Sequence, residues 1–168
     1  GTRVHVFGED SLRQAMTDVG FVLADEDVAV VAASIDWSVN FEKIKRAALL
    51  VRKGALFVAT NLDPTRPTEE GLIPGTGAII APIAVGAEQQ PVAIGKPEPT
   101  MFELAMTKMG ATPRTTATLG DRIDTDMLGG SRAGCSTILV LSGSTALPEA
   151  EAYGPDFLFT DIAHLLRA

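Results

Sequence analysis

The first sixty residues alternate between short apolar runs and longer amphipathic stretches. The apolar runs cover residues 3–7, 28–33 and 56–59. Their length and β-branched content predict strands, and the unbroken run at 28–33 is typical of a strand covered on both faces. The stretches between them, residues 12–19 and 41–51, have apolar side chains at helical spacing and are followed by glycine. This strand–helix–strand–helix–strand order favours a parallel sheet.

The pattern changes after residue 59. Residues 60–77 are rich in Pro, Gly, Thr and Asp, and a loop of that length is usually either functional or disordered. Residues 78–87 predict a helix that Pro82 should kink or shorten. Further strands are predicted at 91–94, 116–119, 137–141 and 157–159, and helices at 100–109, 124–133 and 162–166. A boundary between 87 and 92 divides the chain into predicted domains of residues 1–90 and 91–168.

Composition excludes several classes of protein. Hydrophobic residues make up 46% of the 168 and charged residues 21%, which is enough apolar material for a core. The net charge of −7 argues against a nucleic-acid surface, and no apolar run is long enough for a membrane span. Cys135 is the one cysteine, so no disulfide forms within the chain. We therefore expect a reducing, cytoplasmic location, with Cys135 buried as a small apolar group.

Three carboxylates follow the predicted strand at 116–119. Asp121, Asp124 and Asp126 lie where that strand meets the next helix, and ligands of open α/β sheets bind at such strand ends. Mg²⁺ prefers carboxylate oxygens and retains part of its water shell. The alternative is a solvated turn in which Asp124 caps the helix.

Four segments in a fixed order resemble a known family. They are Ala59-Thr60-Asn61-Leu62-Asp63, Pro74-Gly75-Thr76-Gly77, Gly95-Lys96-Pro97, and the acidic turn 120–126 continuing to Ser142-Gly143. Each segment is common by chance, but their joint order is similar to that of the haloacid dehalogenase-like (HAD) hydrolases. The closest pattern is the subfamily with a large α/β cap (subfamily IIA), which includes 4-nitrophenyl, pyridoxal phosphate, phosphoglycolate and glycerol phosphate phosphatases.

The resemblance implies an α/β fold and an activity. Residues 1–90 would form an α/β cap that sets substrate specificity, and residues 91–168 the carboxyl-terminal half of a Rossmann-like parallel sheet. The intact protein would be a Mg²⁺-dependent hydrolase of small phosphorylated metabolites, acting through an aspartyl-phosphate. Phosphoryl transfer of this kind depends on positioning and on offsetting the charge of the phosphoryl oxygens.

The resemblance also assigns roles to individual residues of the second domain. Lys96 matches the charge-balancing lysine of the family. Asp121 matches the aspartate that binds the metal, and Asp126 the aspartate that supports the metal directly or through water. Asp124 is interpreted as a residue of the helix start. For Lys96, the alternative is an ordinary exposed lysine at a strand end.

In the predicted cap, the resemblance points to a substrate-facing loop. Its matching residues are Thr60, Asn61, Asp63 and Arg66. A guanidinium such as that of Arg66 could bind a carboxylate or hydroxyl of the leaving group. The alternatives are turn chemistry for Asn61 and Asp63, and a solvated Arg66. Trp37 and Phe41, at the start of a helix, are interpreted as packing residues.

One part of the family pattern is absent from the 168 residues. The nucleophile segment, Asp-x-Asp-Gly-Thr after an apolar strand, does not occur. We therefore expect a chain truncated at its amino end, inactive alone, and prone to homodimerise or exchange strands through open sheet edges. Two other hypotheses are kept: a noncatalytic HAD-like binding module, and a nucleotide-binding domain, which would lack the usual glycine-rich loops.

Overall fold

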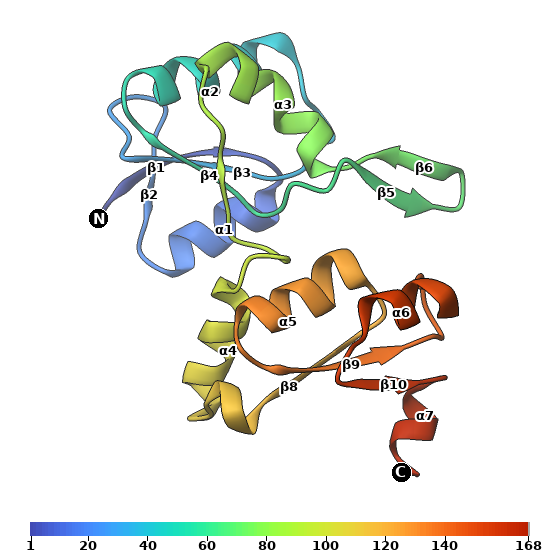
Figure 1. Cartoon of the computed structure of the whole chain (residues 1–168). Helices are drawn as coiled ribbons and strands as arrows, with labels where there is room; N and C mark the ends of the chain where they lie inside the picture. Colours follow the sequence, from blue (N-terminus) through green and yellow to red (C-terminus); the bar gives the residue numbers. More distant parts are fainter. Residues whose placement is uncertain (168) are drawn as a thin grey trace. The chain divides into compact units, whose positions relative to one another are not determined.

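The computed structural model describes residues 1–167, and these form two compact units (Figure 1). The first unit runs from Gly1 to Ile94, and the second begins at Gly95. Within the described residues, no helix combines the length and apolar character needed to cross a membrane.

The first unit is built on a five-stranded parallel sheet with the order β2-β1-β3-β4-β7. Its strands are β1 (Arg3–Phe7), β2 (Val22–Leu23), β3 (Val30–Ala33), β4 (Leu56–Ala59) and β7 (Val92–Ala93). Its helices are α1 (Asp10–Asp18), α2 (Phe41–Arg52) and α3 (Thr76–Ala87). An antiparallel hairpin of β5 (Thr65–Thr68) and β6 (Gly71–Pro74) lies outside the sheet (Figure 1).

The larger core of this unit lies on one face of the sheet. Phe57 and Val31 are fully buried there against Ile80 and Ile83 of α3 and the apolar side of α2. A smaller cluster around Val4 covers the α1 side. The unbroken apolar run of β3 therefore contributes to clusters on both faces, as its sequence predicts.

The second unit has a three-stranded parallel sheet with the order β10-β9-β8. The strands are β8 (Ala117–Gly120), β9 (Ser136–Val140) and β10 (Phe157–Phe159). Its helices are α4 (Thr100–Met109), the 3-10 turn η1 (Pro113–Thr115), the π-helical turn η2 (Ile123–Met127), α5 (Leu128–Arg132), α6 (Leu147–Tyr153) and α7 (Ile162–Leu165). Met127, Leu139 and Ala150 form its most buried cluster. Cys135 is buried, as predicted, and it packs against Met106.

The predicted α/β class is confirmed, but several local predictions are wrong. The segment 60–77 is not a plain loop, because it contains the β5–β6 hairpin. Nearly all hairpin residues are exposed, so their sequence lacks the alternating pattern of a half-buried strand. The helix at 76–87 is not shortened by Pro82. The helix at 147–153 is absent from the predicted elements.

The boundary between the units also differs from the prediction. β7 pairs with β4, so residues 92–93 belong to the first sheet and the division falls after Ile94, four residues later than predicted. The assignment of the two units to a cap and to half of a core stays a prediction.

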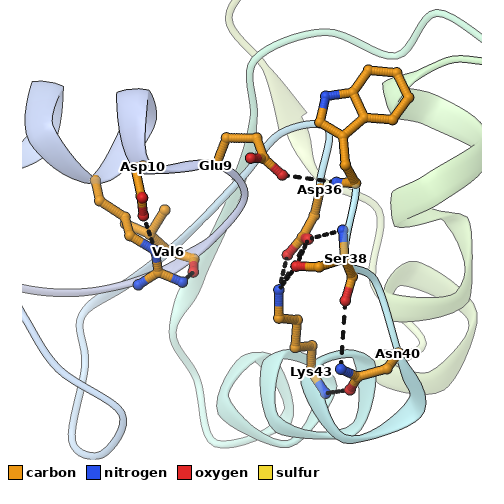
Figure 2. A network of polar contacts seen from close by, with 9 residues as sticks. Val6, Glu9, Asp10, Asp36, Ser38, Asn40 and Lys43 are labelled. Carbon is orange, nitrogen blue, oxygen red and sulfur yellow. Dashed lines mark hydrogen bonds and ion pairs between the residues drawn. The ribbon is translucent and has the colours of Figure 1, made fainter.

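A buried ion pair fixes the segment after β3. Asp36, only 2% exposed, accepts hydrogen bonds from Lys43 Nζ at 2.9 and 2.7 Å and from the backbone and hydroxyl of Ser38 (Figure 2). Burial would raise the pKa of Asp36, but these hydrogen bonds outweigh burial and hold the pKa below its usual value. The ionised carboxylate thus attaches this segment to the first turn of α2.

Replacing Lys43 should destabilise the first unit strongly. Lys43→Met keeps the apolar stem but leaves the buried Asp36 carboxylate without its cation, which should lower the free energy of unfolding by about 3 kcal/mol. The measurement is urea denaturation at neutral pH. Lys45→Met is the matched control, because Lys45 pairs with Glu42 on the surface and should cost under about 0.5 kcal/mol. Equal effects of the two substitutions would contradict this account.

Candidate active site

The acidic turn joins β8 to η2, and one glycine permits its shape. Gly120 ends β8, and a Cβ at this position would overlap the side chain of Asp126. The absence of a side chain lets Asp126, from the second half of the turn, fold back against the strand end. Asp126 is consequently buried, with 8% of its surface exposed.

Asp126 fixes both a lysine and the turn itself. Lys96 Nζ donates to Asp126 Oδ1 at 2.6 Å, across thirty residues of sequence. Asp126 Oδ2 accepts from the backbone N–H groups of Asp121 and Arg122 at 3.3 and 3.2 Å. Both carboxylate oxygens are therefore engaged, and the lysine is held beside the end of β8.

Residues that follow β9 fix the side chain of Asp121. Its Oδ2 accepts from the backbone N–H of Ser144 at 2.8 Å and from the Ser144 hydroxyl at 2.5 Å. A Cβ on Gly143 would overlap the Asp121 side chain, so this close approach requires glycine there. The Ser144 hydrogen bonds, the side-chain one foremost, lower the pKa of Asp121. Asp121 Oδ1 takes part in neither of the hydrogen bonds with Ser144.

Asp124 has a different partner. Arg122 donates to its two oxygens from Nε at 3.0 Å and from Nη2 at 2.6 Å. This forked pair lowers the pKa of the Asp124 carboxyl. The capping alternative for Asp124 is wrong, because no side chain caps η2 and Asp124 lies inside its first turn.

The donor set fits Mg²⁺ bound through one carboxylate. The described residues contain no cluster of three His, Cys, Asp or Glu that could enclose a metal, so the turn is not a complete protein cage. Mg²⁺ usually keeps several waters and takes only one or two carboxylates. Asp121, with its lowered pKa and its available Oδ1, has the chemistry of such a ligand, whereas Asp124 and Asp126 have both oxygens engaged.

The predicted substrate-facing residues follow β4 in the first unit. Thr60 donates from its hydroxyl to Ser34 Oγ at 3.0 Å. Asn61 Oδ1 accepts from the backbone N–H of Asp63 at 3.2 Å, which is the turn chemistry named as the alternative for these two residues. Arg66 lies on β5, with its guanidinium carbon 5.4 Å from the centre of the Trp37 ring.

Three residues gained a role only from the structure. Ser144 and Thr145 hold Asp121, the latter by donating to its backbone carbonyl at 2.6 Å. Their sequence signal was weak, because they follow the quoted Ser142-Gly143 without any distinctive spacing. Trp37 was interpreted as a packing residue, and this is wrong: it is 62% exposed, and Phe41 is 72% exposed.

Comparison with known proteins shows which family the chain resembles. The HAD-hydrolase-like family model matches residues 93–165. An acid sugar phosphatase of Staphylococcus haemolyticus is 38% identical over 162 residues, which are 95% of this chain and 62% of that protein. A 5'-nucleotidase of Bacillus subtilis is 40% identical over 142 residues, 84% of this chain and 56% of that protein.

Solved structures agree. The 4-nitrophenylphosphatase of Thermotoga maritima superposes with a TM-score of 0.92 at 32% identity, over 99% of this chain and 65% of that one. The glycerol phosphate phosphatase of Mycobacterium tuberculosis, solved in complex with magnesium, gives 0.91 at 31% identity, over 98% of this chain and 52% of that one. This chain belongs to the HAD-like hydrolases. It spans about three fifths of the length of the curated HAD-like relatives named above.

Removing the Ser144 hydroxyl should raise the pKa of Asp121. Ser144→Ala deletes the largest contribution that lowers this pKa, so the carboxyl should titrate at higher pH in an NMR pH titration of the Asp side chains. A carboxyl group whose pKa is lower in the folded than in the unfolded state stabilises the fold at pH values above the unfolded pKa. This stabilisation is lost as the pH falls through the folded pKa. Because the pKa of Asp121 is lowered less in the variant, the variant should also be less stable at neutral pH.

Ser131→Ala is the control for this titration, since the Ser131 hydroxyl bonds Tyr153 instead. A titration of Asp121 that is the same in the Ser144 variant as in the parent chain would show that the hydroxyl has no such effect.

Proposed function

We propose that this chain forms part of a Mg²⁺-dependent phosphomonoester hydrolase that acts on small phosphorylated metabolites. The observation that carries the proposal is the Lys96–Asp126–Asp121 arrangement. The buried Asp126 carboxylate binds Lys96 and, through the backbone N–H of Asp121, the end of β8. The side chain of Asp121 at that position is an ionised carboxylate with an oxygen available for a ligand. The relatives named as phosphatases and the magnesium complex of one of them support this proposal.

In this proposal each residue has a distinct task. Lys96 offsets negative charge on the phosphoryl group, and Asp126 keeps its ammonium in place. Asp121 would hold Mg²⁺, while Ser144 keeps the carboxylate ionised and oriented. The bound Mg²⁺ would supply a positive charge that stabilises the phosphoryl oxygens. An aspartyl-phosphate intermediate requires the Asp-x-Asp-Gly-Thr segment, which the 168 residues do not contain.

The first unit is proposed to act as the specificity cap, with Thr60, Asn61, Asp63 and Arg66 facing the leaving group. A cytoplasmic location, inferred from the single buried cysteine, stays a prediction. So does homodimerisation or strand exchange, for which β8 and β10 are the edges of the second sheet.

Mg²⁺ binding should depend on Asp121 and not on Asp124. Asp121→Asn removes the available carboxylate oxygen and should weaken Mg²⁺ binding at least about tenfold, measured by calorimetry on this chain. Asp124→Asn carries the same charge change three residues away and should leave the affinity unchanged, since both Asp124 oxygens bind Arg122. The reverse ranking, or equal losses, would contradict the proposed metal ligand.

Catalysis should appear when the nucleophile segment is supplied. A chimera that joins an Asp-x-Asp-Gly-Thr segment of a family member to Gly1 should hydrolyse 4-nitrophenyl phosphate with Mg²⁺, and the unfused chain should not. In the chimera, Lys96→Gln should lower kcat about 100-fold by removing a charge that stabilises the transition state. Lys108→Gln, an exposed lysine of α4, is the control with the same charge change.

Three results would oppose parts of this proposal. A folded chimera that binds Mg²⁺ but has no activity would favour the noncatalytic module. Activity that survives Lys96→Gln would remove that residue from the mechanism. Full turnover by the unfused chain would show that another residue acts as nucleophile.

A further inference from the structure

A cavity of about 330 Å³ opens beside β1 in the first unit. Its lining comes from β1, α1, α2 and the segments that follow β2 and β3, so the cavity is contained within this unit. Its volume is at the lower end of the range of small-molecule sites. None of the residues to which the proposed function assigns a task lines it. The cavity is therefore a separate candidate for a ligand site.

The cavity lies where β2 ends short of β1. β2 pairs with Arg3 and Val4, and within residues 1–167 no strand continues this pairing along the outer edge of β1. The carbonyl of Val6 accepts instead from Arg13 Nη2 of α1 at 3.0 Å (Figure 2). This bond satisfies a backbone group of the sheet edge and fixes the Arg13 guanidinium in the cavity wall.

His5 is the buried histidine of this cavity. Its side chain is 9% exposed, and its Nδ1 lies 3.0 Å from Asp25 Oδ1. Asp25 Oδ2 pairs with Arg46 at 2.9 Å, and a carboxylate held in an ion pair only accepts, so Nδ1 carries the hydrogen of its bond to Asp25. Nε2 takes no part in this bond. Every sealed side-chain nitrogen of the described residues has a partner, so Nε2 is open to the cavity that His5 lines.

The carboxylates that line the cavity already have cations. The pairs are Arg46 with Asp25, Lys43 with Asp36, and Lys45 with Glu42. Arg13 differs, because the carboxylate it faces, Asp10, is 3.9 Å away and fully exposed, and such a contact contributes little. Among the lining residues, Arg13 is thus the cation whose charge is least neutralised. A guanidinium that donates one N–H to a carbonyl retains others for an anion.

An anion bound at Arg13 would change the charge of His5. Burial lowers the pKa of His5, and the positive charge of Arg13 adds to this effect. Asp25 and the carbonyl of Ala24 raise the pKa but are outweighed. An anion would counter the charge of Arg13 and favour protonation of Nε2. The other charged residues that line the cavity are Asp36, Glu42, Lys43 and Arg46. Residues of these types do not ordinarily titrate between pH 6 and pH 8, whereas histidine does.

We propose that the cavity binds a tetrahedral oxyanion, either free orthophosphate or the phosphoryl group of a small ester, between the Arg13 guanidinium and the protonated Nε2 of His5. The proton comes from solvent, and no covalent bond forms or breaks. Arg13 and His5 approach from a helix and from the sheet, and a tetrahedral anion can offer a different oxygen to each. The site does not depend on the proposed hydrolase activity.

The two histidines of the chain make this proposal measurable by NMR. His5 reports on the cavity, and His164, an exposed residue of α7, is the internal reference. Sulfate is the first probe, because its charge stays constant between pH 6 and pH 8. At constant ionic strength, sulfate should move the His5 ring signals, raise the His5 pKa and leave His164 unchanged. The concentration that produces half of the His5 change should be at least about tenfold lower at pH 6 than at pH 8, as expected for charge-assisted hydrogen bonding.

Further probes identify the ligand. Orthophosphate and glycerol 3-phosphate are compared at pH 7 in EDTA, which removes divalent cations. An effect of orthophosphate alone would assign the cavity to free phosphate, and an effect of both would assign it to a phosphoryl group; each result supports the site. Acetate should move the His5 signals less than sulfate does, and an equal effect would overturn the assignment to a tetrahedral anion.

Variants test the guanidinium while His5 stays in place as the reporter. Arg13→Gln should weaken sulfate binding at least about tenfold, and Arg13→Lys should retain part of the affinity, because only arginine offers several N–H groups in a fixed fork. Arg52→Gln is the matched control, since Arg52 also donates to a backbone carbonyl of the first unit, that of Gly86, and does not line the cavity. Circular dichroism checks that each variant folds. If Arg13→Gln does not fold, the pH dependence in the parent chain decides the question.

Four results would overturn the inference: His5 signals that no oxyanion moves, a change no larger than that of His164, equal affinity at pH 6 and pH 8, or affinity that survives Arg13→Gln in a folded variant. None of these measurements involves Mg²⁺, Lys96 or turnover. An inactive chimera with an intact response of His5 would refute only the proposed hydrolase, and an active chimera without this response would refute only the oxyanion site.

Discussion

The candidate site of the second unit depends on the burial of one carboxylate, that of Asp126. A buried charge is costly unless every oxygen finds a donor, and Asp126 finds three: the ammonium of Lys96 and two backbone N–H groups of its own turn. Its burial therefore fixes the lysine and the path of residues 120–122 together. Gly120 is the steric condition for this arrangement, since any side chain there would displace Asp126.

The partners of the three aspartates, more than their spacing, determine what each can do. Both carboxylate oxygens of Asp126 accept hydrogen bonds from Lys96 or the backbone of its turn, and both carboxylate oxygens of Asp124 accept from the Arg122 guanidinium. Asp121 has one oxygen bound by Ser144, and its lowered pKa keeps the carboxylate ionised. A carboxylate in this condition is a suitable metal ligand, because binding a metal breaks none of its existing hydrogen bonds.

The sequence was informative where a pattern follows from local geometry. β1, β4 and α2 were predicted within a residue or two, because burial imposes a period on their side chains. The hairpin at 65–74 was missed because its side chains are exposed and follow no such period. Lys96, Asp121 and Asp126 were named as candidate site residues from the order of motifs, but the contact between Lys96 and Asp126 depends on tertiary structure. For the same reason, Ser144 and the exposure of Trp37 could not be predicted from their neighbours in sequence.

A second buried pair shows why an aspartate–lysine contact near a strand end does not by itself mark a reactive site. In both pairs a buried aspartate that follows a strand binds a partly exposed lysine, but Lys43, inside α2, also donates to Ser38 Oγ at 2.6 Å. All the donors of that ammonium are used to hold the loop, and none remains for a ligand. The pair is therefore a structural contact: it fixes the backbone between β3 and α2.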